Sequence, residues 1–553
     1  MALKWKLLPS PSNTKDEKYQ GETIRRAGLT VRIARVFSKS SNNGSKQEVE
    51  QTAPFLSLPY ELLEQILDAV ESKNDLCRLR STCGLLNEYL QPRVFEELII
   101  DSASRGSHNT GHLLRALASG KAPFCQLTTT LRISNLLIFS SPSQSHWQNP
   151  NVDETLQPLK EHYILPALKG LRNLKRVHWD LKVKDPYTTM AEGLAAIPSL
   201  EELHITFNHW TANSMFPFDK FSNLRVLDVV ETQSLRQHPF STIVNIRRAI
   251  HASPHLTQLR VMVPTVGQMP TLDDLIVPPV EIRLKRLRMF DSACFAFSMC
   301  LDALSSLTSV NIPNHNEACT APFWAALAHA HVQLLCVTVQ ELTCGLLKYL
   351  ESYSGLQSMQ IKSGTSSLDA QRFLSRFFAD VVPKHRLSLS IISADVLPCR
   401  DFFRTVHPYA LSREHLEAVV QCPMLSRLSV IIHQPWSYRQ SFECAPVRVS
   451  EVLPALATLP QLRHLAITPS WSFDSVISTD LQGQRRQIQE AMLKDVRTVD
   501  VAALETFKFS VQIVDTHLAV TQKDIDGKRT YMFAVVSPTP ASRTDSNSSI
   551  HAL

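Results

Sequence analysis

The chain has 553 residues, of which 44% are hydrophobic and 20% are charged, and its formal net charge is +6. This length is too great for one ordinary hydrophobic core, so it indicates a large or repetitive domain with shorter segments attached. Residues 1–50 contain ten Lys or Arg and five Asp or Glu, so the rest of the chain is nearly neutral. The charge distribution therefore argues against a generally basic, nucleic-acid-binding surface.

The eleven cysteines are an odd number and include no C-x-x-C pair. This pattern favours reduced thiols, as in the cytosol or nucleus, over a disulfide framework. Lys6 and Pro9 interrupt any apolar core of a secretory signal. No apolar run approaches the roughly 18–20 residues needed to span a bilayer. We therefore expect a cytoplasmic or nuclear protein with no membrane partner.

Residues 1–52 are interpreted as a disordered basic leader. The stretch 38–51 is dominated by Ser, Asn, Lys and Gln, which is typical of a linker. The stretch 23–37 is basic with interspersed apolar residues, so a mitochondrial presequence or a nuclear or anionic-surface tether is the alternative. Acids at Asp16 and Glu22 argue against a presequence.

Residues 53–100 predict three short helices. Pro59 suits a first helical position, and helically spaced apolar residues follow it at Leu62, Leu63, Ile66, Leu67 and Val70. Asn74 or Asp75 can cap a second helix that carries Leu76 and Leu79. A third apolar ridge is formed by Cys83, Leu86 and Leu90, and Gln91-Pro92 is expected to end it. Such a module buries little core of its own, so it often docks onto something else.

This segment resembles the F-box, the helical module that binds the Skp adaptor of cullin-RING ubiquitin ligases. The resemblance rests on Leu58-Pro59, Glu61-Leu62-Leu63, Ile66-Leu67, Asp75-Leu76 with Leu79, Ser81-Thr82-Cys83 and the aromatic Phe95. It implies that the adaptor is contacted by Leu58, Pro59, Leu62, Ile66, Leu76, Leu79 and Cys83. The alternative is a plain three-helix packing unit at the edge of a larger domain.

Residues 101–515 carry a recurring phrase: leucine, two residues, an apolar residue, one residue, and another apolar residue. It occurs at LKRVHW, LEELHI, LRVLDV, LTQLRV, LKRLRM, LTSVNI, LQSMQI, LSRLSV and LRHLAI, with LLCVTV fitting between LTSVNI and LQSMQI. The first six begin at Leu174, Leu200, Leu224, Leu256, Leu284 and Leu307, which are 23 to 32 residues apart. Each phrase predicts a short strand with its leucines inward, and several of the intervening stretches have helical spacing before a proline-marked turn.

The predicted fold class is therefore α/β: an N-terminal three-helix F-box followed by an irregular leucine-rich-repeat solenoid. A doubly wound α/β sheet is the structural alternative, because strand–helix alternation alone would also fit it. The combination resembles the large fungal class of F-box proteins with degenerate repeats.

Near the C-terminus, residues 479–500 predict a polar-faced helix with Ile488 and Met492 inward. Residues 507–514 and 531–536 predict two strands that form a hairpin over the open end of the solenoid. We accordingly interpret 516–536 as a C-terminal cap strand and 537–553 as a disordered tail.

The sequence offers no catalytic, metal-binding or cofactor-binding motif, so we expect no enzyme activity. Gly106 and Gly111 have phosphate-loop spacing but lack the Lys that should follow. His329 and His331 are interpreted as a helix-end pair rather than metal ligands. Cys294 and Cys300 lie in an apolar segment and are interpreted as core thiols. An enzyme on an α/β fold is the alternative.

Between the last two apolar positions of each phrase lies one residue that should face the concave side. In order these are His178, His204, Asp228, Arg260, Arg288, Asn311, Gln360, Ser429 and Ala466. Such a row can recognise a partner protein by side-chain complementarity. Arg260, Arg286 and Arg288 form a basic cluster that would favour an acidic or phosphorylated ligand, the alternative being a solvated repeat face.

The resemblance implies the substrate-recognition subunit of an SCF-type ubiquitin ligase. Its expected partners are the Skp adaptor, a cullin scaffold through that adaptor, and an unidentified target protein; no nucleic acid is expected. The alternative function is an interaction scaffold that uses the same repeats without joining a ligase.

Overall fold

The computed structural model describes most of the chain between residues 58 and 536. The described residues are 58–70, 72–101, 107–134, 136, 160–181, 185, 187–207, 216–231, 240–263, 271–278, 281–289, 300–312, 317–363, 369–396, 410–432, 447–469, 481–496, 499, 509–513, 516–525 and 528–536. The predicted leader and tail lie outside these residues. The chain divides into two compact units, Met1–Leu76 and Cys77–Leu553.

The first unit contains helix α2 (Tyr60–Asp68) and the start of α3 (Lys73–Arg80). Pro59 precedes α2 as the sequence predicts, and its carbonyl accepts hydrogen bonds from the backbone N–H groups of the third and fourth residues after it. Leu63 and Leu67 are the buried residues of this helix, one turn apart. Their burial confirms one apolar face of α2, but it leaves Leu62 and Ile66 exposed.

The second unit opens with the rest of α3 and with α4 (Gly84–Phe95), which buries Leu86, Leu90 and Val94. The prediction that this helix ends at Gln91-Pro92 is wrong, because α4 continues through Pro92. Pro92 cannot donate to the carbonyl four residues earlier, which belongs to Glu88. Glu88 is exposed, so water can satisfy that carbonyl and the helix tolerates the proline.

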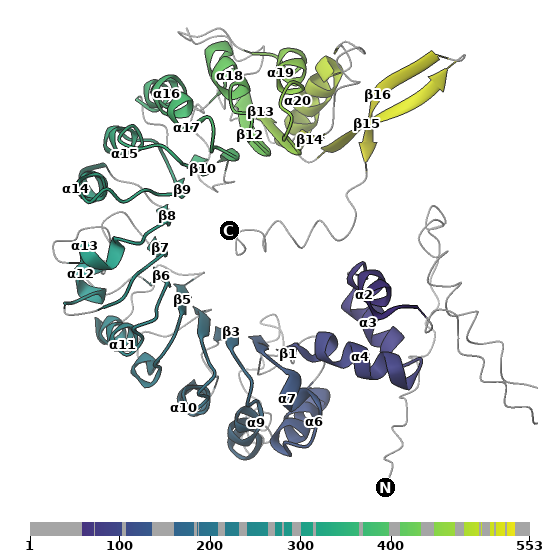
Figure 1. Cartoon of the computed structure of the whole chain (residues 1–553), viewed down its shortest axis with the longest axis vertical. Coiled ribbons are helices and arrows are strands. Elements are labelled where there is room, and N and C mark those ends of the chain that lie inside the picture. Colours follow the sequence, from purple (N-terminus) through teal and green to yellow (C-terminus); the bar gives the residue numbers. More distant parts are fainter. Residues whose placement is uncertain are drawn as a thin grey trace, which may run out of the picture. The chain divides into compact units, whose positions relative to one another are not determined.

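The described part of the second unit is mixed α/β and contains a sheet of 16 strands that follow one another in sequence order (Figure 1). The strands are β1 (Glu97–Asp101), β2 (Thr130–Ser134), β3 (Arg176–Leu181), β4 (Glu202–Phe207), β5 (Val226–Glu231), β6 (Gln258–Met262), β7 (Arg286–Met289), β8 (Ser309–Ile312), β9 (Cys336–Val339), β10 (Ser358–Ser363), β11 (Ile391–Val396), β12 (Arg427–Ile432), β13 (His464–Pro469), β14 (Ser510–Ile513), β15 (Thr516–Ile525) and β16 (Lys528–Val536). Pairing is parallel from β1 to β14 and antiparallel for the last two pairs.

Helices connect the parallel strands and lie on the outer side of the curved array, with the strands along the inner side (Figure 1). They are α6 (Ser107–Ala118), α7 (Phe124–Leu127), η2 (Lys160–Ile164), α9 (Leu165–Gly170), α10 (Tyr187–Ala195), η3 (Phe218–Lys220), α11 (Phe240–His251), α12 (Leu272–Leu275), α13 (Leu301–Leu304), α14 (Glu317–His329), α15 (Cys344–Leu350), α16 (Ala370–Arg376), η5 (Phe377–Val381), α17 (Val382–His385), α18 (Arg413–Val420), α19 (Val449–Leu456) and α20 (Leu481–Val496). None of the described helices is both long and apolar enough to cross a bilayer.

One face of the sheet is covered and the other is open, which follows from the alternation along the strands. In β3, for example, Val177, Trp179 and Leu181 are buried, whereas the residues between them are partly exposed. The first leucine of every phrase is also buried, as at Leu174 and Leu356. A doubly wound sheet would cover both faces with helices, so the sequential order and the open face exclude that alternative.

Buried aromatic residues fill two places between the sheet and its helices. Phe207, Phe218 and Phe221 pack around Phe216, and Trp179 packs edge-on against Phe216 at 5.7 Å between ring centroids. The Trp179 Nε1–H also donates to the Asp185 carboxylate at 3.1 Å, which satisfies the indole inside the core.

A second aromatic cluster, formed by Tyr349, Tyr353 and His385, connects successive repeats through hydrogen bonds to backbone groups. The Tyr349 hydroxyl donates to the Val332 carbonyl at 2.9 Å and accepts from the Leu334 N–H at 3.1 Å. The Tyr353 hydroxyl donates to the Leu334 carbonyl at 2.8 Å, and its ring contacts His385 edge-on. Burial raises the pKa of Tyr349 to about 12, so this hydroxyl remains a donor across the physiological range.

Strands occur at every predicted phrase, including LLCVTV in β9, but the sequence did not indicate β1, β2 or β11.

The predicted C-terminal hairpin is wrong in its pairing. Residues 510–513 form β14, a further parallel strand, and the hairpin is β15–β16. The segment 516–536, interpreted above as one cap strand, forms two antiparallel strands, β15 and β16. Helix α20 and its buried Met492 are confirmed, whereas the side chain of Ile488 lies outside the described residues.

Candidate functional site

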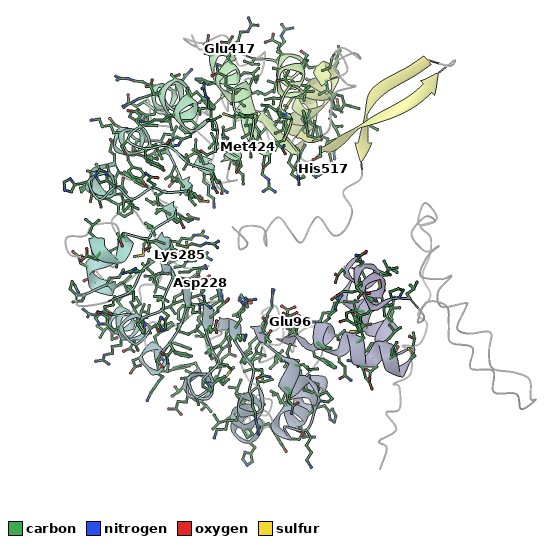
Figure 2. All side chains as sticks on the ribbon, viewed as in Figure 1. Glu96, Asp228, Lys285, Glu417, Met424 and His517 are labelled. Atoms are coloured by element: carbon green, nitrogen blue, oxygen red, sulfur yellow. The ribbon has the colours of Figure 1, made fainter. Side chains whose placement is uncertain are left out.

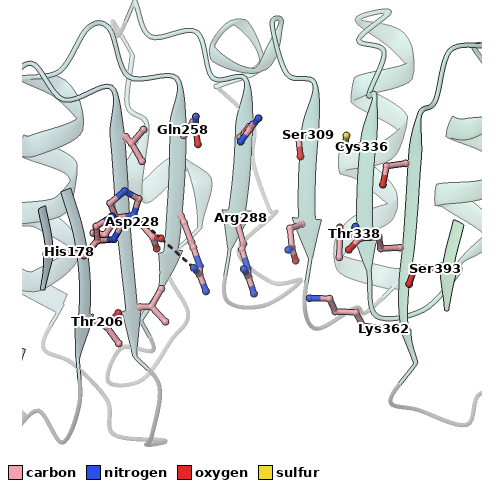
Figure 3. Close-up of a pocket in the computed structure, with 18 of the residues that line it drawn as sticks. His178, Thr206, Asp228, Gln258, Arg288, Ser309, Cys336, Thr338, Lys362 and Ser393 are labelled. Atoms are coloured by element: carbon pink, nitrogen blue, oxygen red, sulfur yellow. Dashed lines mark hydrogen bonds and ion pairs between the residues drawn. The ribbon is translucent and has the colours of Figure 1, made fainter. Parts of the chain in front are cut away.

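The open face of the sheet carries a groove of about 1540 Å³ lined by side chains from successive strands (Figure 3). Its central line, here called the middle row, has one residue per strand from β2 to β14 in direct register. These residues are Arg132, His178, His204, Asp228, Arg260, Arg288, Asn311, Thr338, Gln360, Ser393, Ser429, Ala466 and Gln512. Figure 2 shows Asp228 on the inner side of the array and Glu417 of α18 on the outer side.

All nine residues predicted from the repeat phrase for the concave face lie in the middle row. Sequence reasoning missed Arg132, Thr338, Ser393 and Gln512. Thr338 lies in LLCVTV and could have been found by applying the same rule to that phrase. The strands of Arg132 and Ser393 carry no regular leucine phrase and were not indicated by the sequence. Gln512 lies in the predicted strand 507–514, where its position between Val511 and Ile513 could have marked it.

Two histidines on the neighbouring strands β3 and β4 stack inside the groove. The rings of His178 and His204 are 4.2 Å apart with an interplanar angle of 14°. Burial, followed by the charges of His204, Arg132 and Arg176, lowers the pKa of His178 to about 3, so this ring is neutral at physiological pH.

The pKa of His204 is shifted in the opposite direction, because two carboxylates flank its ring. Its Nδ1 lies 3.2 Å from an Asp228 carboxylate oxygen, and its Nε2 lies 3.7 Å from Glu202. Burial alone would lower the pKa of His204, but its interactions with Asp228 and Glu202 together outweigh burial and raise it. The neighbouring His204, aided by the Arg176 guanidinium, lowers the pKa of Glu202 to about 2.

Asp228 also holds Arg260, whose Nη1 lies 3.3 Å from the same carboxylate oxygen (Figure 3). The Nε of Arg260 lies 3.3 Å from the Met262 sulfur, which fixes a second edge of the guanidinium. The side chains of Asp228 and Arg260 are 13% and 19% exposed, so solvent screens this pair less than a surface salt bridge. A chain of contacts therefore runs from Glu202 through His204 and Asp228 to Arg260.

The next two positions of the middle row are less satisfied. The Arg288 Nε and the Asn311 Oδ1 are buried and have no hydrogen-bond partner among the described residues. Burial, followed by the positive charge of Arg260, lowers the pKa of Arg288 to about 10, so its guanidinium stays charged at neutral pH. A partner that supplies an acceptor for the Arg288 Nε and a donor for the Asn311 Oδ1 would satisfy the hydrogen bonding of both side chains.

We expect Asp228→Asn to lower the pKa of His204, because the substitution removes one of the two carboxylates that favour its protonated form. Histidine ring signals followed by NMR against pH would measure this change. His251 lies on α11, on the outer side of the array and away from Asp228, so its titration should not change and provides an internal reference. An unchanged His204 titration would show that Asp228 does not set its charge.

The seven residues expected to contact an adaptor are distributed over both units. In the first unit, Pro59, Leu62 and Ile66 are exposed, whereas Leu58 and Leu76 are partly buried. In the second unit, Leu79 and Cys83 are partly buried. Leu62 and Ile66 are one turn apart on α2 and 46% and 42% exposed, so they form an apolar strip that the fold leaves open.

The residues weighed as catalytic or metal-binding occupy structural positions. His329 ends α14, and His331 follows in the turn with a positive φ of 54°, which makes them a helix-end pair as predicted. Cys300 is buried, and burial raises its pKa to about 12, which confirms a core thiol; Cys294 lies outside the described residues. Gly106 also lies outside them. The described residues contain no group of three or more His, Cys, Asp or Glu that could hold a metal ion.

Comparisons with known proteins provide no further identification, since neither a family model nor a curated protein matches the chain.

Proposed function

We propose that this protein is a substrate-recognition subunit of an SCF-type cullin-RING ubiquitin ligase. In this proposal the segment 53–100 is an F-box that binds the Skp adaptor, and the parallel sheet with its outer helices is a leucine-rich-repeat solenoid that binds the target. The observation that carries the proposal is the exposed apolar strip formed by Leu62 and Ile66 on α2. These are two of the positions at which the F-box resemblance expects adaptor contacts.

The strip is unusual for this chain. Six large hydrophobic residues of the described part are strongly exposed, namely Tyr60, Leu62, Ile66, Leu85, Leu387 and Met424. Four of the six belong to the short segment that resembles the F-box, and three of these four lie on α2 alone. Apolar side chains that cluster at the surface mark sites of protein contact more often than scattered ones do.

The groove supports the second half of the proposal. Its middle row presents charged and polar side chains from successive strands at regular register, with room for an extended segment of another protein. Long concave faces of stacked repeats are used in this way for protein recognition. The protein's own contribution would be proximity: it would raise the effective concentration of target lysines near a bound ubiquitin-conjugating enzyme.

The alternative is an interaction scaffold that uses the same groove but joins no ligase. The fold of the second unit supports it equally, because a repeat face can bind a partner without an adaptor. The two functions differ in what the α2 strip does.

Adaptor capture tests the proposal. We expect the full chain to co-purify with the Skp adaptor and the double variant Leu62→Ala, Ile66→Ala to lose at least a hundredfold in affinity. Each side chain, if buried by the adaptor, contributes about 1.5–3 kcal/mol relative to exposure. The matched control is Gln65→Ala, on the exposed side of the same helix, which should bind as the wild type does.

Alanine is a strong helix former, so circular dichroism should show the same helix content in all three proteins. If the wild type fails to capture the adaptor, or if the double variant captures it equally well, the ligase proposal fails and the scaffold function takes its place.

A further inference from the structure

The charges in the centre of the groove do not balance. Asp228 is shared between His204 and Arg260, and Glu202 is shared between Arg176 and His204. Two strands further on, β7 carries Arg286 and Arg288 on the same open face, because residues two apart on a strand point the same way. Neither of these arginines forms an ion pair with a described residue.

The two arginines differ in how they are held. Arg286 is exposed, whereas Arg288 is partly buried and its Nε is cut off from solvent without a partner. Arg260, paired in register with Arg288, is oriented by Asp228 and by the Met262 sulfur. Figure 3 shows Arg288 extended from β7 into the groove, beside the arginine that the dashed line joins to Asp228.

Asn311 completes the arrangement on the other side of Arg288, its register partner on β8. Its Oδ1 is buried without a hydrogen-bond partner among the described residues, so a donor group of a ligand would be satisfied there. The site thus offers guanidinium donors from two neighbouring strands and one amide, all at the bottom of one groove.

We propose that Arg260, Arg286, Arg288 and Asn311 form a binding site for a phosphorylated serine or threonine of the target protein. This inference rests on the proposed function, since it assigns a chemical class to the protein that the groove recognises.

Charge and donor geometry favour a phosphate ester over a carboxylate. A phosphorylated side chain carries a charge of about −1.5 to −2 at neutral pH, which matches the two unpaired arginines, whereas a carboxylate neutralises only one of them. A phosphate also presents three oxygens, enough to accept from two guanidinium forks and still leave one for solvent. A protonated phosphate oxygen or the neighbouring peptide N–H can donate to Asn311 Oδ1.

Fluorescence anisotropy with the full chain tests this site. The probe is a labelled pool of degenerate peptides with a fixed central phosphoserine, compared with the same pool carrying serine or glutamate at that position. We expect the phosphoserine pool to bind most tightly and Arg288→Gln to weaken it about 10–100-fold, as the loss of charge-assisted hydrogen bonds implies. Arg286→Gln should weaken it in the same direction. Because Arg286 is exposed, this second variant keeps the test decisive if Arg288→Gln does not fold.

The matched control is Arg372→Gln, which removes the same charge from an exposed position of α16 on the outer side. It should leave phosphopeptide binding unchanged. Equal binding of the glutamate and phosphoserine pools would overturn the assignment of phosphate. If Arg372→Gln weakened phosphopeptide binding as much as Arg288→Gln, the loss would be explained by net charge alone, and the assigned phosphate site would also be overturned.

Adaptor capture separates this inference from the function on which it rests. If the wild type captures the adaptor but shows no preference for phosphoserine, only the phosphate site fails. If it prefers phosphoserine in an Arg288-dependent way but captures no adaptor, the phosphate site stands and the ligase proposal fails.

Discussion

Trp179→Ala is expected to lower the free energy of unfolding by about 3–5 kcal/mol, the usual cost of truncating a large aromatic residue in a core. Trp179 is 1% exposed on β3 and packs edge-on against Phe216 at 5.7 Å. Its indole N–H also donates to the buried Asp185 at 3.1 Å, so the alanine variant leaves both a cavity and a carboxylate that has lost a donor. Urea-induced unfolding of the full chain, followed by far-UV circular dichroism, measures the change.

Trp179→Phe provides the comparison, because it keeps a large aromatic ring in the core while removing the N–H donor and part of the indole volume. We expect it to cost about 1–3 kcal/mol, the penalty for a buried polar group without its partner. If alanine were tolerated as well as phenylalanine, then Trp179 would not be packed between the sheet and its helices as described.

His385→Leu is expected to cost about 2–6 kcal/mol, because it leaves two buried backbone groups without partners at about 1–3 kcal/mol each. The Leu356 N–H donates to His385 Nδ1 at 3.0 Å, so Nε2 carries the ring proton and donates to the Leu350 carbonyl, also at 3.0 Å. Leucine fills similar space but can satisfy neither group. Denaturant unfolding provides the measurement, with His329→Leu as an exposed control that should change stability by less than about 0.5 kcal/mol.

The cost of His385→Leu should also depend on pH. Burial, then the nearby charge of Lys384, lowers the pKa of His385 below its unfolded value of about 6.5. The unfolded chain therefore binds the extra proton first, and the wild type loses stability as the pH falls below about 6.5. Leucine cannot titrate, so the difference between variant and wild type should be smaller at pH 5 than at pH 7.5. A difference that grows on acidification would contradict the neutral, doubly hydrogen-bonded ring.

The positions of the groove residues could be predicted because the repeat phrase fixes both period and direction. In a strand, alternate residues face opposite sides, so two buried leucines define the residue between them as open. His178 and Arg288 were both identified in this way, and the register confirms them. Arg132 and Ser393 were missed because their strands lack the phrase, and only pairing with neighbouring strands brought them into the row.

The sequence by itself determined the alternation of strands and helices, the three helical segments near the N-terminus and the candidate residues of the open face. These are local properties, set by periodicity along the chain. Only the tertiary structure decided which side chains interact across strands. Asp228 is shared between His204, 24 residues before it, and Arg260, 32 residues after it. The buried Arg288 Nε, by contrast, has no hydrogen-bond partner among the described residues. No local pattern specifies such contacts, because strand register brings them together only when the whole sheet has formed.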